Sequence, residues 1–586
     1  MIRYWLLAWL CFLFVPAEGL RSTMTYHPQG ANPLLYTPGL DSIMHLDQNT
    51  FDDTVFDQTK SNSFMVEFYA DWCGFCRAFV PFYRDFAQQI AGWSDVTKVA
   101  AINCADSFNA EVCRRNSVTH FPMVKYFPRL STTYSDAQQI EPSHSVVNLR
   151  DQLASKIINE FNHLHYMDWP NFRYIDVTPT TRFEDLWLGI PLSTQYMAII
   201  FEQFDSVASQ AILDLWKFRQ YVGVRRAMAN SPLTSMLSIQ TFPYVALFRR
   251  GDQQSLFMSQ YHSNVLQEIL NRVQSGQQLN KPTQRPPLQQ QTKQPSRTIN
   301  CTKQPDRCAP LYFVSETDML KAMRQALLDE VIRANEHIRG SNFTSLYNFV
   351  SLLADNFPTS TLTNDVRRRA TIKRAANPQT LRRSENARAM FVQMRRELDT
   401  KPQTVSSKEW KTTFEAMERQ FNNPFPVEAD WQHCKGSGPE YRGYTCGLWT
   451  TFHTITIQAY TNMLKNKKPS PMQPLKAIQG WVNSFFGCQD CRMHFMEMTT
   501  QKFPMTAQRV RQPHDTFMYL WRAHNIVNNR LHKDITEDPQ FLKYQFPPLF
   551  LCPTCHAGGQ FSRRKVRNFL LQYYMSIRPF HRIHSH

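Results

Sequence analysis

Beyond Gly19 the chain has no run of ~18 uncharged apolar residues, the length that a membrane-spanning helix requires. The apolar run near the N-terminus follows an early cation and ends in small residues at Ala17 and Gly19, which is typical of a secretory signal peptide. The C-terminal residues, Arg582 to His586, contain no retention tetrapeptide. We therefore expect residues 1–19 to be a signal peptide, with a short uncleaved anchor as the alternative. The mature chain is expected to have no transmembrane segment and to reside in the endoplasmic reticulum or Golgi lumen or to be secreted.

Residues 165–276 contain no cysteine, which excludes thiol chemistry from that stretch. Removal of the signal peptide also removes Cys11 and leaves twelve of the 13 cysteines, an even number. These cysteines form close pairs in the sequence: Cys73/Cys76, Cys104/Cys113, Cys301/Cys308, Cys434/Cys446, Cys488/Cys491 and Cys552/Cys555. An oxidising compartment favours local disulfides within such pairs. Glycosylation sequons at Asn342 and Asn300 fit the same compartment.

The chain has enough apolar residues for several hydrophobic cores, because 42% of its 586 residues are hydrophobic and 13% are aromatic. At roughly 150 residues per domain, this length predicts about three to five domains. The net charge of +17 is partly concentrated in basic clusters between Arg367 and Arg396. A solvated helical face explains these clusters, and binding to acidic glycans or matrix is the alternative. We expect no nucleic acid partner for a secreted chain, although the charge alone would permit one.

A Cys-x-x-Cys motif lies between an apolar strand that begins at Ser63 and a segment with helical spacing. This order puts Cys73 at a helix N-terminus, where the helix dipole and free backbone N–H groups stabilise a reactive thiolate. Two more strands are expected, over 96–103 and directly after Pro122. An inert structural disulfide at Cys73/Cys76 is the alternative to a redox pair, and Cys104/Cys113 is expected to be a structural clip.

These features resemble the thioredoxin fold of the protein disulfide isomerase family over residues 40–163. The resemblance implies that Pro122 is a cis proline facing the redox pair and that Cys73 is its exposed member. Phe75 stands where isomerases usually have histidine, so this pair should be a weaker oxidant than that of an isomerase. Residues 165–276, where Phe242-Pro243 again precedes a strand, resemble a second, degenerate thioredoxin-like domain.

The middle of the chain lacks any catalytic constellation. Residues 277–299 are rich in Gln and Pro, a composition that behaves as a semi-extended linker. Residues 300–400 begin with the Cys301/Cys308 pair, which we expect to be a structural disulfide, and the sequence that follows predicts mainly helices. We interpret this region as a scaffold that holds the flanking domains.

Two C-terminal helices carry polar and aromatic side chains on one face each. Trp449 and His453 are four residues apart, and Arg442, if helical, precedes Trp449 by seven. On the second helix Trp521, His524, Asn525 and Asn528 fall within about 100° of arc. Indole, imidazole and amide groups on one stripe suit a planar ligand that accepts and donates hydrogen bonds. A polar solvated stripe with scattered aromatics is the alternative.

Four motifs in residues 406–560 resemble the Erv-type FAD-dependent sulfhydryl oxidase domain. They are Arg-Gly-x-x-Cys-x-x-Trp-x-x-x-His, Cys-x-x-Cys-x-x-His, Trp-x-x-His-Asn-x-x-Asn and the trailing Cys552-Pro-Thr-Cys555. Joined to an N-terminal thioredoxin domain, this is the architecture of quiescin sulfhydryl oxidases. Residues 561–586 are left as a C-terminal tail. The expected fold is therefore multidomain, with α/β thioredoxin-like domains, one redox-active and one degenerate, followed by an all-α region that contains an FAD-binding helical bundle.

The resemblance implies roles for individual residues. Those expected to contact FAD are Arg442, Trp449, His453, Asp490, His494, Trp521, His524, Asn525, Asn528, Lys543 and Phe546. Phe546 stands where the family usually has tryptophan, so an indole N–H donor is lost there. Cys488 and Cys491 match the pair that reduces the flavin, with Cys491 next to it. Cys434/Cys446 matches a structural bridge, and Cys552/Cys555 a pair whose redox role is accessory at most.

The predicted function is a thiol oxidase that takes electrons from reduced protein thiols. Cys73/Cys76 would pass them to Cys488/Cys491, then to FAD and to molecular oxygen, which gives H₂O₂. Three alternatives stay open at this stage. They are an isomerase-like exchange protein without oxidase activity, a basic matrix-binding protein, and a zinc module built from the 488/491 and 552/555 pairs.

Overall fold

The computed structural model describes residues 34–178, 180–204, 207–275, 301, 303–359, 383–465 and 470–580. The predicted signal peptide, the Gln/Pro-rich linker, the sequon at Asn300 and the basic cluster over 367–382 lie outside these residues. In the described ranges no helix is both long enough and apolar enough to cross a membrane.

The first α/β domain is built on a mixed sheet with strand order β1-β3-β2-β4-β5. β1, β3 and β2 run parallel, β4 runs antiparallel to β2, and β5 runs antiparallel to β4. Its strands are β1 (Met44–Leu46), β2 (Ser63–Tyr69), β3 (Thr97–Asn103), β4 (Met123–Phe127) and β5 (Gln138–Ile140), and its helices are α1 (Phe51–Val55), α2 (Gly74–Gln89), α3 (Ala110–Arg115) and α4 (Val146–Leu164). The apolar and aromatic β2 is buried at every position, as a central strand covered on both faces should be.

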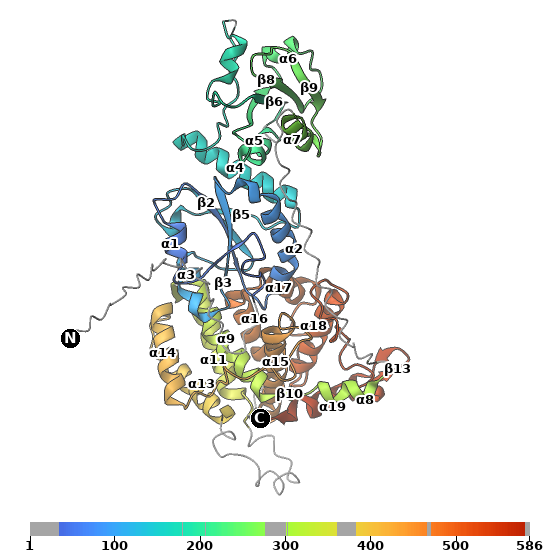
Figure 1. Ribbon diagram of the computed structural model, residues 1–586. Coiled ribbons are helices and arrows are strands. Elements are labelled where there is room, and N and C mark those ends of the chain that lie inside the picture. Colours follow the sequence, from blue (N-terminus) through green and yellow to red (C-terminus); the bar gives the residue numbers. More distant parts are fainter. Residues whose placement is uncertain are drawn as a thin grey trace, which may run out of the picture.

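The second α/β domain repeats this plan with strand order β7-β6-β8-β9. Its elements are β6 (Tyr196–Glu202), α5 (Ala208–Trp216), β7 (Val222–Met228), α6 (Pro232–Met236), β8 (Tyr244–Arg249), β9 (Ser255–Gln260) and α7 (Val265–Ser275). It meets the first domain through α5, where Asp214 accepts a hydrogen bond from Trp93 Nε1 (2.7 Å) and pairs with Arg150 (2.8 Å). The domain lies at one end of the molecule, far from the helical region (Figure 1).

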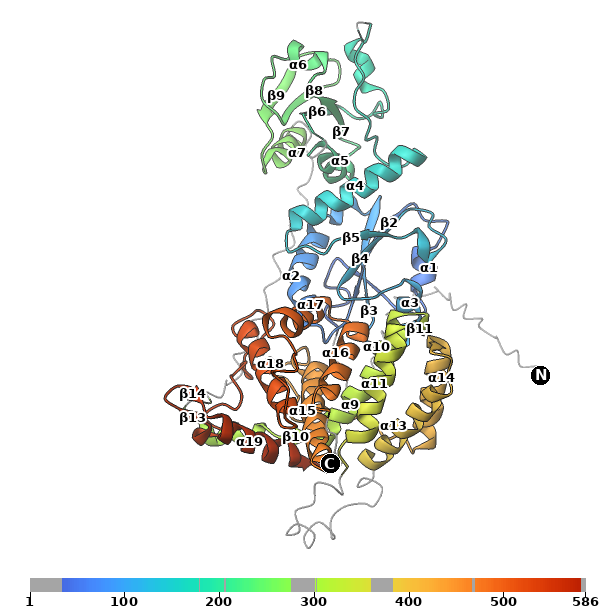
Figure 2. The same ribbon diagram turned by 180° about the vertical axis from the view of Figure 1, so that it is seen from behind.

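The helical region forms the opposite end of the molecule. Its main helices are α9 (Glu316–Leu327), α10 (Asp329–Ala334), α11 (Ser341–Asn356), α13 (Arg383–Asp399), α14 (Ser407–Gln420), α15 (Gly443–Met463), α16 (Gln473–Phe485), α17 (Gln489–Glu497), α18 (Asp515–Leu531) and α19 (Arg563–Met575). α15 is buried on most sides because it packs against α9, α11, α16, α18 and α19. It is the central helix of the bundle (Figure 2).

The C-terminal segment differs from the expectation of a tail after residue 560. Residues 563–575 form α19, which packs on α15, and β15 (Ile577–Arg578) pairs in parallel with β10 (Val314–Ser315). Val566, Leu570 and Tyr574, spaced four apart, bury one face of α19. The end of the described chain therefore closes the bundle instead of leaving it.

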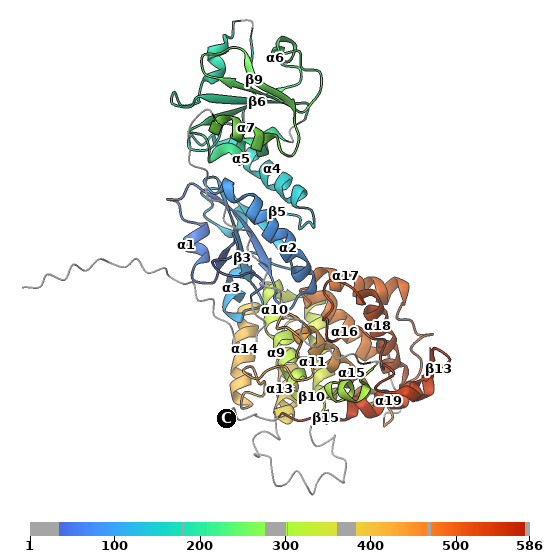
Figure 3. The same ribbon diagram turned by 45° about the vertical axis from the view of Figure 1, so that its right-hand side comes forward.

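The first α/β domain sits between the other two parts, as Figure 3 shows. Its hydrophobic core is continuous with that of the helical region, whereas the second α/β domain has two core clusters of its own. The redox motif of the first domain faces this shared core. The candidate site therefore lies at the junction of these two parts.

Candidate active site

The upstream cysteine pair lies where β2 gives way to α2. Cys73 is the N-cap of α2, with extended backbone angles (φ −77°, ψ 117°), and Cys76 lies in the first turn. Neither cysteine forms a disulfide with another described residue. Burial opposes ionisation of Cys73, but hydrogen bonds from Cys76 and the charge of Arg77 outweigh it and lower the Cys73 pKa. Burial raises the pKa of Cys76 well above its usual value. Of the two thiols, Cys73 is therefore the one that ionises more readily.

A buried carboxyl group that the sequence analysis did not single out lies beneath this pair. Burial raises the pKa of Glu67, on β2, to about 8. Glu67 accepts a hydrogen bond from the Tyr36 hydroxyl and interacts electrostatically with both cysteines. A charged residue in an otherwise apolar strand was the signal that could have revealed it.

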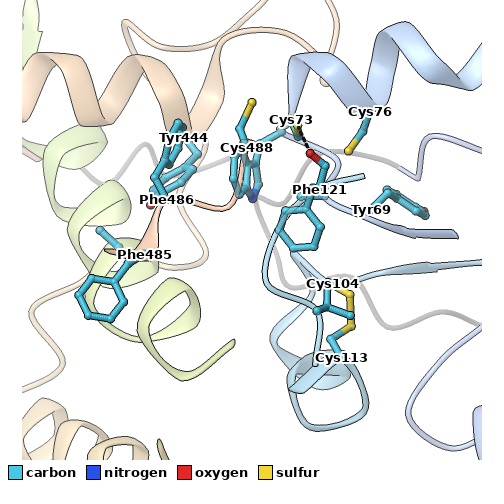
Figure 4. Packing of buried hydrophobic residues seen from close by; sticks show 14 of the residues in the cluster. Tyr69, Cys73, Cys76, Cys104, Cys113, Phe121, Tyr444, Phe485, Phe486 and Cys488 are labelled. Atoms are coloured by element: carbon cyan, nitrogen blue, oxygen red, sulfur yellow. Dashed lines mark hydrogen bonds between the residues drawn. A yellow bond between two sulfur atoms is a disulfide. The ribbon is translucent and has the colours of Figure 1, made fainter. Parts of the chain in front are cut away.

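The segment between α16 and α17 is joined to the first domain by main-chain contacts at the redox site. The N–H of Phe121 donates to the carbonyl of Gly487 (2.8 Å), and Phe121 forms a parallel β-bridge with Cys488. The Cys73 thiol in turn donates to the carbonyl of Phe121 across 4.0 Å. Figure 4 shows Cys73, Phe121 and Cys488 gathered at this junction. The Phe121–Pro122 peptide bond directly before β4 is cis.

Aromatic side chains seal this junction. The Trp72 ring stacks on Phe486 (centroids 5.6 Å apart) and meets Tyr444 edge-on (4.9 Å). As a result Cys73 is fully buried, so the expectation that it is the exposed member of its pair is wrong in this arrangement. Cys73 is buried because the Gly487–Cys488 backbone lies against the loop at Phe121, beside the Cys73 thiol.

The two cysteines of the downstream pair, Cys488 and Cys491, face different parts of the molecule. Cys488 is the N-cap of α17 and is disulfide-bonded to Cys491. Cys488 is fully buried against the first α/β domain, whereas Cys491 lines a cavity of about 510 Å³ in the helical region. In the structure Cys73 and Cys76 are free thiols, whereas Cys488 and Cys491 are joined by a disulfide.

Most of the residues predicted to contact a cofactor line this cavity. They are Arg442, Trp449, Asp490, His494, His524, Asn528, Lys543 and Phe546. Trp449 and His524 stack almost parallel (7°) with centroids 4.0 Å apart. Asp490 lies 3.3 Å from His494 and 3.6 Å from Arg530. Arg442 has a φ of 65° and precedes α15, so it does not share a helical face with Trp449, but its side chain still reaches the cavity.

The predicted contacts His453, Trp521 and Asn525 do not line the cavity and instead hold its wall. Trp521 Nε1 and Asn525 Nδ2 donate to the Phe546 carbonyl (2.6 and 2.9 Å), and Asn525 Oδ1 accepts from the Phe546 N–H (2.8 Å). His453 Nε2 lies 2.9 Å from His524 Nδ1. These side chains therefore fix Phe546 and His524, which do line the cavity.

The cavity wall also contains residues that the sequence analysis missed. They are Phe75, Arg77, His144, Tyr312, Phe313, His433, Phe541, Tyr573 and Tyr574. Tyr573 and Tyr574 come from α19, and their place on an amphipathic helical segment was the signal available in the sequence. Phe75 and Arg77 come from α2, so the first α/β domain contributes to the wall.

The cavity suits an anionic ligand that carries flat rings. Arg442 stacks on Phe541 (4.1 Å), and its buried Nη1 has no hydrogen-bond partner among the described residues. Burial, together with the charges of Arg442 and Arg77, lowers the pKa of Lys543 to about 8. Such a cationic cluster calls for an anion such as a diphosphate. The aromatic walls fit a planar ring system, so these residues fit FAD.

The other cysteines form disulfides within their sequence pairs: Cys104–Cys113, Cys301–Cys308, Cys434–Cys446 and Cys552–Cys555. The sulfurs of the 488/491 and 552/555 pairs are thus each bonded within their own pair. A zinc ligand needs a thiolate, so these disulfides argue against the zinc alternative.

Comparison with known proteins gives the same division of the chain. Residues 42–149 match the thioredoxin family model and residues 446–547 match the Erv1 / Alr family model. The fold and the site therefore define a multidomain protein in which a thioredoxin redox pair meets the disulfide of an Erv-type helical domain.

Curated relatives share this combination. Sulfhydryl oxidase 1 of Rattus norvegicus is 27% identical over 89% of this chain, which spans 64% of that protein's length. Sulfhydryl oxidase 2 of Mus musculus is 25% identical over 93% of this chain and 74% of its own length. A solved sulfhydryl oxidase fragment of human QSOX1 is 27% identical over 45% of this chain and 97% of that fragment, with a TM-score of 0.37. The chain is thus similar to sulfhydryl oxidases over about nine tenths of its length.

Proposed function

We propose that this chain is an FAD-dependent thiol oxidase that introduces disulfides into proteins of the secretory pathway or the extracellular space. The observation that carries the proposal is the main-chain bridge between Phe121 and Gly487–Cys488. It brings the reduced Cys73/Cys76 pair to the oxidised Cys488/Cys491 pair, whose Cys491 faces the cavity.

Electron entry begins with the Cys73–Cys76 disulfide. A substrate thiolate attacks Cys73 Sγ and displaces Cys76, and the second substrate thiolate then displaces Cys73, which leaves an oxidised substrate and a reduced pair. Because Cys73 is buried in the docked arrangement, the first domain must separate from the Gly487–Cys488 segment before a protein substrate can reach it.

Transfer between the pairs follows from the docked geometry. The Cys73 thiolate attacks Cys488 Sγ, and Cys491 leaves as a thiolate. Cys76 then attacks Cys73 and releases Cys488, which restores the upstream disulfide. Glu67, with its pKa near 8, is suited to accept the proton that Cys76 must lose in this second step.

The residues of the cavity would hold FAD through its rings and its diphosphate. Trp449, His524 and Phe546 offer flat faces, and Arg442 with Lys543 offers the positive charge. When bound, FAD supplies two-electron transfer from thiols to O₂, with H₂O₂ as the product.

Stopped-flow mixing of the purified protein with a reduced protein substrate tests this function. We expect a bound flavin whose visible absorbance bleaches on reduction and recovers as O₂ is consumed. An isomerase-like exchange protein would carry no flavin, and a basic matrix-binding protein would take up no O₂ with reduced protein thiols. Either result would contradict the proposal.

A further inference from the structure

A buried ion pair lies at the junction between the first α/β domain and the helical region. It belongs to residues 300–400, which were predicted to be a scaffold. Glu330 and Arg333, on the short helix α10, are 2.8 Å apart, and each side chain is 3% exposed. α10 packs against α3 of the first α/β domain (Figure 2). Buried charges are costly unless their hydrogen bonds are satisfied, so the partners of this pair indicate what it does.

The Arg333 guanidinium donates hydrogen bonds to the loop before Pro122 and to the segment before Cys488. Its Nη1 donates to the carbonyl of Val118 (3.1 Å), in the loop that leads to Pro122. Its Nη2 donates to the carbonyl of Phe485 (2.9 Å), just before Cys488. The guanidinium also lies over the Phe121 ring, 4.7 Å from the centroid. One side chain therefore joins the Val118–Phe121 loop, whose Phe121 carbonyl contacts Cys73, to the segment that leads to Cys488.

Glu330 completes the connection. Its Oε2 accepts from Arg333 Nη2 and from the Gly487 N–H, both at 2.8 Å. The carbonyl of the same Gly487 accepts from Phe121. Gly487 is packed so closely that an added Cβ would lie 2.7 Å from Arg333 Nη2 and 2.8 Å from the Phe121 ring. The carboxylate and the guanidinium thus fix the backbone at the N-cap of α17 from one side, and Phe121 fixes it from the other.

We propose that Glu330 and Arg333 are positioning residues that set the relative geometry of Cys73 and Cys488 for disulfide exchange between the domains. This inference rests on the proposed function. In the exchange a Cys73–Cys488 bond forms and the Cys488–Cys491 bond breaks, with Cys491 as the leaving thiolate, so no outside oxidant enters the step. Small misplacement of reacting groups costs rate steeply, about 100-fold for 1 Å.

The partners of the pair distinguish positioning from general stabilisation. A purely structural ion pair would bond within its own bundle, as Arg324 does when it binds both oxygens of Glu418 on α14 (2.8 and 3.3 Å). The pair on α10 instead bonds Val118, Phe485 and Gly487, all within three residues of Phe121 or Cys488. Other charged groups near the junction, His120 and Arg492, interact with Arg333 only electrostatically.

The test compares Arg333→Met and Glu330→Gln with the control Arg324→Met in the full-length flavoprotein. Pre-reduced Cys73/Cys76 should reduce the flavin roughly 10- to 100-fold more slowly in Arg333→Met, because the attack geometry is lost. Glu330→Gln, which keeps an acceptor for Gly487, should show a smaller effect. Dithiothreitol, which can reduce Cys488 directly, should act on all variants at the wild-type rate, and flavin content should be unchanged.

A second measurement excludes effects on the flavin. In a background with Cys76→Ser and Cys491→Ser, mild oxidation should form the Cys73–Cys488 disulfide, which mass spectrometry of peptides quantifies. Arg333→Met should slow its formation, whereas Arg324→Met should not. Equal rates in all variants, or an equal loss with dithiothreitol and protein thiols, would overturn the positioning role. Absence of flavin reduction in the wild type would instead contradict the proposed function itself.

Discussion

Phe121 and Gly487, separated by more than half of the chain, share a main-chain hydrogen bond of 2.8 Å at the junction of two domains. This bond places the loop before the cis proline of the thioredoxin domain on the N-cap of α17, so Phe121 contacts both Cys73 and Cys488. In the proposed relay, this contact would permit electron transfer, and it also buries Cys73. The proposal therefore requires both a docked and an undocked arrangement in each turnover.

Replacement of single cysteines should separate entry of electrons from their delivery. Cys73→Ser is expected to abolish turnover of reduced proteins but to leave oxidation of dithiothreitol, which can reach Cys488 directly. Cys491→Ser should block both substrates, since Cys491 is the member that faces the cavity. Oxygen uptake with each substrate measures this.

The control for the cysteine variants is the Cys552–Cys555 disulfide, which lies outside the proposed relay. Its double serine variant should retain turnover of both substrates. Equal loss on protein and dithiothreitol in Cys73→Ser would contradict the relay. Normal oxygen uptake in Cys491→Ser would contradict its assignment.

A methyl group at Gly487 should disturb the junction without touching any cysteine. In Gly487→Ala the new Cβ meets Arg333 and Phe121 at less than 3.0 Å, so the docked arrangement must shift. Overpacking of this kind costs about 1–3 kcal/mol. We expect turnover of protein thiols to fall about 5- to 100-fold, as that energy implies, while oxidation of dithiothreitol changes little.

Gly92→Ala is the matched control, because its Cβ would meet only the flexible end of Lys217 at 3.3 Å or more. It should leave both activities unchanged. If Gly487→Ala has wild-type activity with protein thiols, the close approach at this glycine is not required for transfer.

The buried Glu67 should make stability depend on pH. Its pKa of about 8 lies above the 4.5 of an exposed glutamate, so the folded protein holds this proton more tightly than the unfolded chain. Its contribution to stability is therefore fully present below pH 4.5 and is lost as pH rises toward and through 8. The slope is at most about 1.4 kcal/mol per pH unit for one proton.

Glu67→Gln removes this titration and keeps an acceptor for Tyr36. Compared with the wild type, the variant should gain relative stability between pH 5 and pH 9, as measured by unfolding temperatures of the reduced protein. Parallel pH profiles for the two proteins would show that Glu67 does not hold its proton. The same variant should slow release of Cys488 by Cys76, which single-turnover flavin reduction detects.

The sequence predicted local features well and tertiary ones poorly. The N-cap position of Cys73 follows from a strand, a Cys-x-x-Cys and a helix in immediate succession. Helical periodicity grouped Trp521 with His524, but it could not tell that Trp521 points to the irregular segment at Phe546. Arg333 binds carbonyls 215 and 152 residues away in the chain, contacts that no periodic pattern encodes.

Affinity for FAD should depend on the charge of Lys543. Burial, together with the charges of Arg442 and Arg77, lowers the pKa of this ammonium to about 8, so it loses its proton as pH rises through about 8. Lys543→Met should weaken FAD binding by about 10- to 100-fold, since a charged hydrogen bond contributes about 1.5–3 kcal/mol. Fluorescence titration of the apoprotein with FAD measures this affinity.

The pH profile of binding separates this charge from its side-chain shape. In the wild type, affinity should fall above pH 8 because the neutral amine no longer attracts the diphosphate. Lys543→Arg keeps its charge at every accessible pH, so its affinity should stay flat, and Lys543→Met should be weak and flat. Lys411→Met, an exposed lysine 4.0 Å from Glu415 on α14, should bind FAD as the wild type does. A wild-type affinity that is constant from pH 7 to 9, or unchanged binding in Lys543→Met, would place the diphosphate away from Lys543 and leave Arg442 as its main cationic partner.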